Sequence, residues 1–270
     1  MTKKLTLREI QLLELDMMKA VVEFCDRHQL TYVLCGGTLL GAVRHQGFIP
    51  WDDDIDLLMP REDYEKFLAL HDIFEKEFPF TVASNRLNNL KRPYCRILNK
   101  QTICNRQFID DTEENFLWID IFPLDGLPSD KQKVQSYLNQ MGRLNKLLVI
   151  ALSRTGEGKS RIKKIVKPVV KSLLNIVGVK RLVNYTDKMC QRYTIADSDF
   201  VGENIMARKA QEMMPKEAFL TTVNVNFEGL TVKSPSNWDY YLEKKYGNYM
   251  QLPPESEQVN HTADIYLVED

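Results

Sequence analysis

The sequence contains no long apolar stretch. The longest nearly apolar run, LLVIAL at residues 147–152, is far shorter than the roughly 20 residues that a membrane-spanning helix needs. The first residues, MTKKLTLREI, lack the apolar centre of a secretory signal peptide. We therefore expect a cytoplasmic protein that is neither exported nor membrane-spanning.

An excess of charge of either sign is also missing. The 36 Lys and Arg residues nearly balance the 37 Asp and Glu residues, which leaves a formal net charge of −1. Proteins that bind nucleic acid usually carry a basic excess, so we expect no nucleic-acid partner. Any preference for a charged ligand must come from a local cluster.

Cysteine is present without a pattern. The chain contains no CxxC pair and no Cys/His spacing typical of a zinc site. An odd number of scattered cysteines favours reduced thiols over disulfides. The five are Cys25, Cys35, Cys95, Cys104 and Cys190.

The sequence does contain well-marked helical and strand-like segments. Thr6 and Glu9 fit a capping box, and apolar residues recur every three or four positions after them, which predicts a helix over residues 6–28. We predict further helices at 38–45 and 61–77, helical structure throughout 130–193, and a last helix at 238–246. We predict strands at 32–35, 54–59, 80–84, 93–99, 116–124 and 263–268, and a hairpin turn at 227–230. This order predicts an α/β (α+β) fold with a mixed β-sheet core flanked by helices. Residues 1–130 and 200–270 would form the core, and residues 131–199 a basic helical insertion.

The stretch PWDDDID at residues 50–56 places four carboxylates within five positions. In a strand, Asp54 and Asp56 point to one face and Ile55 to the other, so the acidic pair would line a cleft. Two carboxylates about 4 Å apart repel by roughly 4 kcal/mol at an effective dielectric constant of about 20. A bound Mg²⁺ ion, or Mn²⁺ in its place, would offset this repulsion, because both prefer oxygen ligands.

A further aspartate, Asp120, lies inside the otherwise apolar stretch WIDIF, where an unpaired charge would be costly. We therefore predict that Asp120 lies beside Asp54 and Asp56 on a neighbouring strand. It would either share their metal ion or act as the base for an incoming hydroxyl group. Asp52 and Asp53 precede the predicted strand and have weaker support.

A glycine pair stands between a predicted strand and a predicted helix. Glycine lets backbone N–H groups approach an anion closely, and a helix N-terminus adds partial positive charge. We predict that Gly36, Gly37 and the following Thr38 contact a phosphate group. A glycine pair, an acidic run and a strand aspartate each usually have a structural role. In this order, however, they point to metal-assisted phosphoryl or nucleotidyl transfer.

Three cationic or titratable side chains are further candidates for substrate contacts. Arg44 and His45 end the helix after the glycines. They could contact phosphate or the acceptor, although Arg44 could equally pair with an aspartate of the acidic run. Arg96 lies on a predicted strand, where an inward side chain could neutralise phosphate and an outward one would simply be exposed.

Two aromatic residues and one histidine complete the candidates. Trp51 and Phe48 flank the acidic run, and could stack on a base, hold a quaternary ammonium group by cation–π attraction, or pack the loop. His261 is the only histidine in the C-terminal half. It could act as an acid or base, although a lone histidine near a terminus is more often structural.

The segment GGTLLGAVRHQGFIPWDDDIDLLMPREDYEKF, residues 36–67, closely resembles the signature of the LicD family. These phosphocholine transferases are related to the fukutin-type proteins and belong to the nucleotidyltransferase superfamily, so the resemblance implies a nucleotidyltransferase-like catalytic core. WIDIFPLDG, FEGLTVKSP, YLEKKYGNYMQLPP and the late His261 resemble further blocks of the family. The resemblance covers about 1–130 and 205–265.

The resemblance implies transfer of phosphocholine from CDP-choline to a sugar hydroxyl of a cell-wall or cell-surface glycan, such as a lipid-linked teichoic acid precursor. CMP would be released and Mg²⁺ required. It further implies that Gly36 and Gly37 hold the diphosphate, that Asp54 and Asp56 bind metal, and that Asp120 is a third ligand or the base. Choline and cytidine follow from the resemblance alone.

Two other functions compete with this one. A nucleotidyltransferase would use the same metal site but transfer the nucleoside monophosphate. A non-catalytic module that binds glycan or lipid would be expected to have lost its acidic site residues, whereas Asp54, Asp56 and Asp120 are all present. The family is also diverse, so a related CDP-linked donor could replace CDP-choline.

The predicted insertion contains a basic segment. Residues 159–181 hold eight Lys or Arg and no Asp or Glu, interleaved with apolar residues. A basic amphipathic helix can lie on an anionic membrane, where each basic residue contributes about 1 kcal/mol. We therefore expect either a membrane-surface or acceptor-binding element, which would place the protein at the inner face of the cell membrane, or a structural helical hairpin. Pro168 argues against one continuous helix.

Overall fold

The computed structural model of the protein describes residues 2–105, 115–153, 161–206, 209, 212–258 and 264–268, with only the backbone of 161–167. The helices are α1 (Leu7–Arg27), α2 (Gly36–His45), α3 (Arg61–Ala69), α4 (His71–Glu77), α5 (Lys131–Leu152), α6 (Arg161–Val177), α7 (Val179–Cys190), α8 (Lys216–Leu220) and α9 (Trp238–Tyr246), with short 3₁₀ turns η1 (Asn85–Leu87) and η4 (Glu255–Glu257). The strands are β1 (Thr2–Lys4), β2 (Val33–Leu34), β3 (Asp56–Pro60), β4 (Thr81–Ala83), β5 (Cys95–Asn99), β6 (Thr102–Asn105), β7 (Leu117–Leu127), β8 (Phe200–Glu203), β9 (Met214–Pro215), β10 (Thr222–Phe227), β11 (Leu230–Pro235) and β12 (Asp264–Val268).

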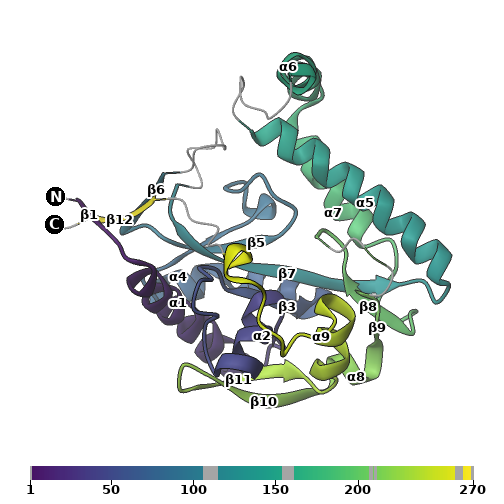
Figure 1. The fold of residues 1–270 in the computed structure, drawn as a ribbon. Coiled ribbons are helices and arrows are strands. Elements are labelled where there is room, and N and C mark those ends of the chain that lie inside the picture. Colours follow the sequence, from purple (N-terminus) through teal and green to yellow (C-terminus); the bar gives the residue numbers. More distant parts are fainter. Residues whose placement is uncertain are drawn as a thin grey trace.

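The central sheet is mixed and has the order β2-β3-β7-β5-β4, with β8 and β9 added beside the far end of β7. β3 and β7 are parallel, and their register places Asp56 opposite Asp120. The other neighbours in this sheet pair antiparallel. Figure 1 shows helices on both sides of β7, with α2 and α9 below it and α5 and α7 above it. The predicted mixed sheet flanked by helices is confirmed.

Local signals account for several of these elements. At the start of α1, Thr6 Oγ1 accepts from the Glu9 N–H and Glu9 Oε2 accepts from the Thr6 N–H, which completes the predicted capping box. α9 has the predicted bounds. The predicted hairpin is β10-β11, and its turn lies at Glu228 and Gly229.

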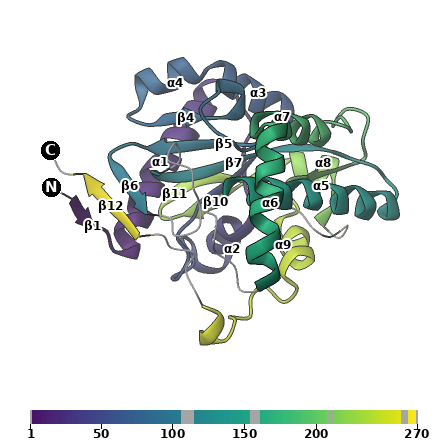
Figure 2. The same ribbon diagram turned by 90° about the horizontal axis from the view of Figure 1, so that it is seen from above.

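The helices α5, α6 and α7 lie between two strands that are neighbours in the sheet. The chain leaves the sheet at the end of β7 and returns on β8, which pairs with β7. α5 and α7 pack side by side, and α6 lies at the end of this group farthest from the sheet (Figures 1 and 2). No helix within the described ranges is both long enough and apolar enough to cross a bilayer.

The glycine pair lies within a helix, not in the turn that we predicted before one. α2 begins at Gly36, after Cys35. Gly36 has a φ of +55°, a left-handed conformation that glycine adopts without steric cost. The chain therefore turns at Gly36 and enters the helix at once.

The acidic run is only partly a strand. β3 begins at Asp56, so Asp54 lies in the preceding loop and not on the strand predicted for 54–59. The pairing with β7 still reaches towards Asp54, because the Asp120 N–H donates to the Ile55 carbonyl at 2.9 Å. The predicted alternation also holds, since Ile55 and Leu57 are fully buried.

The single helix predicted for 61–77 is wrong. The structure has two helices, α3 and α4, which are separated at Leu70. The bend lets Phe74 pack against Phe24 and Phe67, with ring centroids 5.3 and 5.6 Å apart. No Gly or Pro marks this bend, which is why periodicity alone missed it.

The cysteines agree with the expectation of reduced thiols. All five are buried, and none forms a disulfide.

Candidate active site

A cleft of about 570 Å³ opens where β3 begins, beside α2 and α9. Carboxylates from separate elements line it: Asp52, Asp54, Asp56, Asp120, Glu203 and Glu257. The structure therefore brings Asp120 together with Asp54 and Asp56, although more than sixty positions separate it from them in the sequence. Asp53 is not among the lining residues.

Backbone hydrogen bonds fix the position of Asp56. Its N–H donates to Thr38 Oγ1 at 2.8 Å, and its carbonyl accepts from the Cys35 N–H at 3.3 Å. Thr38 is buried and does not line the cleft. In this structure, Thr38 holds the start of β3 against α2 and does not face the space where a phosphate would bind.

The two glycines bring α2 close to the carboxylates. A Cβ atom on Gly36 would lie 3.2 Å from Asp56 Oδ2, and one on Gly37 would lie 2.6 Å from Asp52 Oδ2. The positive end of α2 therefore faces the acidic cluster and partly offsets its charge. The Gly36 N–H donates to the Tyr241 hydroxyl at 3.1 Å, so it already has a partner.

The cleft strongly disfavours ionisation of its carboxyl groups. Burial, together with the charges of Asp52, Asp120 and Asp53, raises the pKa of Asp54 to about 8. Burial and the charge of Asp54 also raise the pKa of Asp56 well above its usual range. These shifts indicate that the residues present supply too little positive charge for the carboxylates gathered here.

Asp120 differs from this pair because a cation of the protein accompanies it. Arg96 is buried and donates through Nε to Asp120 Oδ1 at 2.7 Å. Trp118 Nε1 donates to Asp120 Oδ2 at 3.2 Å. The Arg96 guanidinium also lies 4.5 Å from the Trp118 ring centroid. Arg96 is thus an inward strand residue that contacts Asp120, and it is not among the residues that line the cleft.

Lys245 was not anticipated from the sequence. It lies on α9, lines the cleft, and forms an ion pair with Glu212 at 3.2 Å. Burial opposes its charge, but the neighbouring Tyr246 and Glu212 outweigh this effect, and the pKa of Lys245 is above its ordinary value. Of the described residues that line the cleft, Lys245 alone is basic. Only the fold could reveal it, because nearly 190 residues separate it from Asp56.

The remaining candidates separate into different roles. Trp51 lines the cleft. Phe48 is buried against Phe227, with ring centroids 4.9 Å apart, and so packs the loop. Arg44 donates to the Tyr249 carbonyl at 2.8 Å and to His45 Nε2 at 2.9 Å. Neither Arg44 nor His45 is among the residues that line the cleft.

His261, the last candidate, lies outside the described residues.

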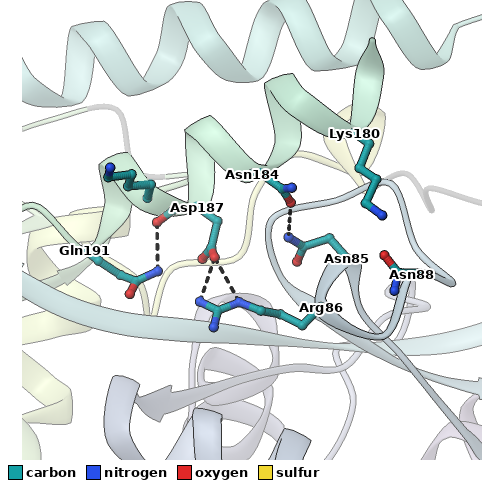
Figure 3. A pocket seen from close by; sticks show the side chains of 8 residues that line it. Asn85, Arg86, Asn88, Lys180, Asn184, Asp187 and Gln191 are labelled. Carbon is teal, nitrogen blue, oxygen red and sulfur yellow. Dashed lines mark hydrogen bonds and ion pairs between the residues drawn. The ribbon is translucent and has the colours of Figure 1, made fainter.

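A second hollow, of about 380 Å³, lies between η1 and α7 (Figure 3). Asp187 of α7 accepts from Arg86 at 2.7 Å across it, and Asn85 donates to Asn184 at 3.1 Å. Asp187 also accepts from Arg61 at 3.1 Å. These contacts join α7 to the sheet domain, so this hollow is a structural junction and holds none of the predicted site residues.

The donor set of the main cleft fits a hard divalent cation. Asp54 and Asp56 offer carboxylate oxygens in a place that is short of positive charge. Among the described residues, no three His, Cys, Asp or Glu side chains form a ready metal-binding group. Mg²⁺ typically takes only one or two protein carboxylates and completes its shell with water and substrate phosphate. The pair Asp54 and Asp56 meets that requirement, whereas Arg96 already accompanies Asp120.

Fold and cleft together define an α/β protein with a mixed sheet and a cleft lined by carboxylates. Residues 29–141 match the sequence model of the family described as LicD/FKTN/FKRP, nucleotidyltransferase domain. The chain is 30% identical, over 98% of its length and all of the relative's, to the lipopolysaccharide cholinephosphotransferase LicD of Haemophilus influenzae. It is also 30% identical, over 48% of its length and 52% of the relative's, to an uncharacterised protein of Rickettsia prowazekii.

The chain belongs to the LicD family. The resemblance seen in residues 36–67 is thereby confirmed, and so is the prediction of a transferase enzyme. The similarity to the Haemophilus protein extends through α5, α6 and α7, since it spans 98% of the chain.

Proposed function

We propose that this chain transfers phosphocholine from CDP-choline to a sugar hydroxyl of a glycan and releases CMP, with Mg²⁺ as cofactor. The observation that carries this proposal is the convergence of Asp54, Asp56 and Asp120 in one cleft. Full-length similarity to a cholinephosphotransferase supports the choice of transferred group. The name of that relative specifies lipopolysaccharide as the acceptor, whereas from the sequence we gave a teichoic acid precursor as an example of the acceptor. A glycan hydroxyl is common to both.

The reaction is a displacement at phosphorus. The acceptor oxygen attacks the phosphorus atom next to choline, a new P–O bond forms, and the bond to the CMP oxygen breaks. A dication held by Asp54 and Asp56 would neutralise charge on the phosphate oxygens. Asp120 takes the proton of the attacking hydroxyl, because Arg96 orients its side chain and the strand register places it opposite Asp56. Lys245 pairs with a donor phosphate oxygen.

Recognition of choline fits the same cleft. Aromatic side chains line it, namely Trp51, Tyr94, Phe122, Tyr241 and Tyr246. Aromatic faces attract a quaternary ammonium group, and nearby carboxylates strengthen that attraction. We assign Trp51, at the edge of the acidic loop, to this contact.

Product analysis tests the proposal. The purified chain is incubated with Mg²⁺, a glycan acceptor and CDP-choline, CDP-ethanolamine or CDP-glycerol in turn. We expect CMP and a phosphocholine-labelled acceptor from CDP-choline. Asp54→Asn should lower the rate at least about a hundredfold, whereas the same change at the exposed Asp72 of α4 should leave it unchanged.

The alternative function has a different signature. A nucleotidyltransferase would release pyrophosphate from a nucleoside triphosphate, or leave the nucleoside monophosphate on the acceptor. Either product, without CMP from any CDP-linked donor, would overturn the proposal. CMP release from a CDP-linked donor other than CDP-choline would keep the reaction and correct the donor.

A further inference from the structure

α6 presents an apolar face that no described part of the chain covers. Val169, Leu173, Ile176 and Val177 are 58%, 58%, 81% and 52% exposed. At 3.6 residues per turn, the four side chains fall within an arc of about 100° around the helix axis, which is one face of the helix. α5 and α7 pack against α6 elsewhere, and Figure 1 shows α6 at the extremity of the molecule, away from the sheet. Side chains of this kind and number are rarely left in water.

The charge of the same segment indicates what covers this face. Residues 159–181 carry eight of the chain's 36 Lys and Arg and none of its 37 Asp and Glu, so the remainder has 28 basic residues against 37 acidic ones. The sequence therefore concentrates positive charge in and next to the segment that forms α6. Lys180 and Arg181, just after α6, are exposed.

We infer that α6 is a membrane-docking helix that lays its apolar face into the surface of a bilayer containing anionic lipid. An apolar face on a cationic helix suits the boundary between headgroups and acyl chains, where it gains both burial and attraction to negative headgroups. A second copy of the chain is a poorer occupant. Two copies of this face would bring two cationic segments together with no acidic residue in either to offset them.

Docking would hold the protein on a lipid surface without any helix crossing it. The inference concerns residues outside the carboxylate cleft, and does not depend on which group the cleft transfers. Its test can therefore fail or succeed independently of the proposed function.

Vesicle co-sedimentation of the full chain tests the inference. We expect binding to vesicles of phosphatidylcholine mixed with phosphatidylglycerol at low salt, weaker binding at high salt, and little binding to phosphatidylcholine alone. The double variant Leu173→Ser, Ile176→Ser should lower the partition coefficient at least about tenfold. The matched control is Leu12→Ser, which alters an exposed apolar residue of α1 and should bind like the parent chain. Circular dichroism and thermal unfolding verify that each variant is folded.

Three results would overturn the inference. One is the absence of sedimentation with anionic vesicles at low salt. Another is equal binding by the double variant and the control. If light scattering instead showed a dimer that the double variant abolished, without vesicle binding, the face would be an interface between copies and the inference would be wrong.

Discussion

At the scale of single residues, Lys245 is the basic side chain among the described residues that line the acidic cleft. In the proposed reaction a donor with two phosphates would approach Asp52, Asp54 and Asp56, and Lys245 would offer it positive charge. A charge-assisted hydrogen bond to phosphate typically contributes about 1.5–3 kcal/mol. The residue should therefore act mainly on donor binding.

We predict that Lys245→Met raises the KM for the CDP-linked donor at least about tenfold and changes kcat less, because it removes ground-state binding. Lys244→Met is the matched control. Lys244 is adjacent on α9 but lies 5.0 Å from the Tyr240 ring centroid and is not among the lining residues. Steady-state kinetics on both variants makes the test, and equal KM values for the two variants would rule out the assigned role.

At the scale of elements, features that depend on residues close in sequence could be predicted from the sequence. The cap at Thr6, the strand alternation around Ile55 and the bounds of α9 all depend on neighbours within a few positions. The bend at Leu70 and the start of α2 at Gly36 depend on tertiary packing. The Arg96–Asp120 pair also depends on tertiary structure, because the register between β5 and β7 sets it. The position of α9 beside the cleft depends on tertiary structure as well. These partners are distant in sequence, so no local pattern contains them.

Asp187 makes the attachment of α7 testable. Its side chain is only 8% exposed and pairs with both Arg61 and Arg86. We predict that Asp187→Asn lowers the free energy of unfolding by about 2 kcal/mol, because Arg61 and Arg86 lose a buried charged partner. Both keep other counter-charges, since Arg61 also pairs with Asp125 and both pair with Glu65. Urea denaturation measures this change. Asp16→Asn, which breaks an exposed pair with Lys19, should cost less than about 0.5 kcal/mol. Similar losses in both variants would contradict the structural role of Asp187.

At the scale of the whole molecule, the buried acids make stability depend on pH. An acid whose pKa is raised on folding stabilises the protein fully below its unfolded pKa, and this contribution is lost as pH rises towards the folded pKa. For Asp54 the interval runs from about 3.8 to about 8. Glu14, buried on α1, and Asp56 shift in the same direction.

We therefore predict that the metal-free protein loses free energy of unfolding between about pH 4 and pH 8, by up to about 1.4 kcal/mol per pH unit for each proton involved. Asp54→Asn should flatten this slope, because its amide does not titrate. Urea titrations in chelator at a series of pH values provide the measurement. A wild-type slope that is zero or positive would show that these carboxyl groups ionise freely in the folded protein.

The central claim is that Asp54 and Asp56 hold a dication while Asp120 acts on the acceptor. Titration with Mn²⁺, followed by electron paramagnetic resonance, tests it directly. The account predicts saturable binding by the parent chain and at least about tenfold weaker binding by Asp54→Asn and by Asp56→Asn. Asp120→Asn should bind Mn²⁺ within about threefold of the parent chain and yet lose transfer activity. No Mn²⁺ binding by the parent chain, or undiminished binding by Asp56→Asn, would contradict the account.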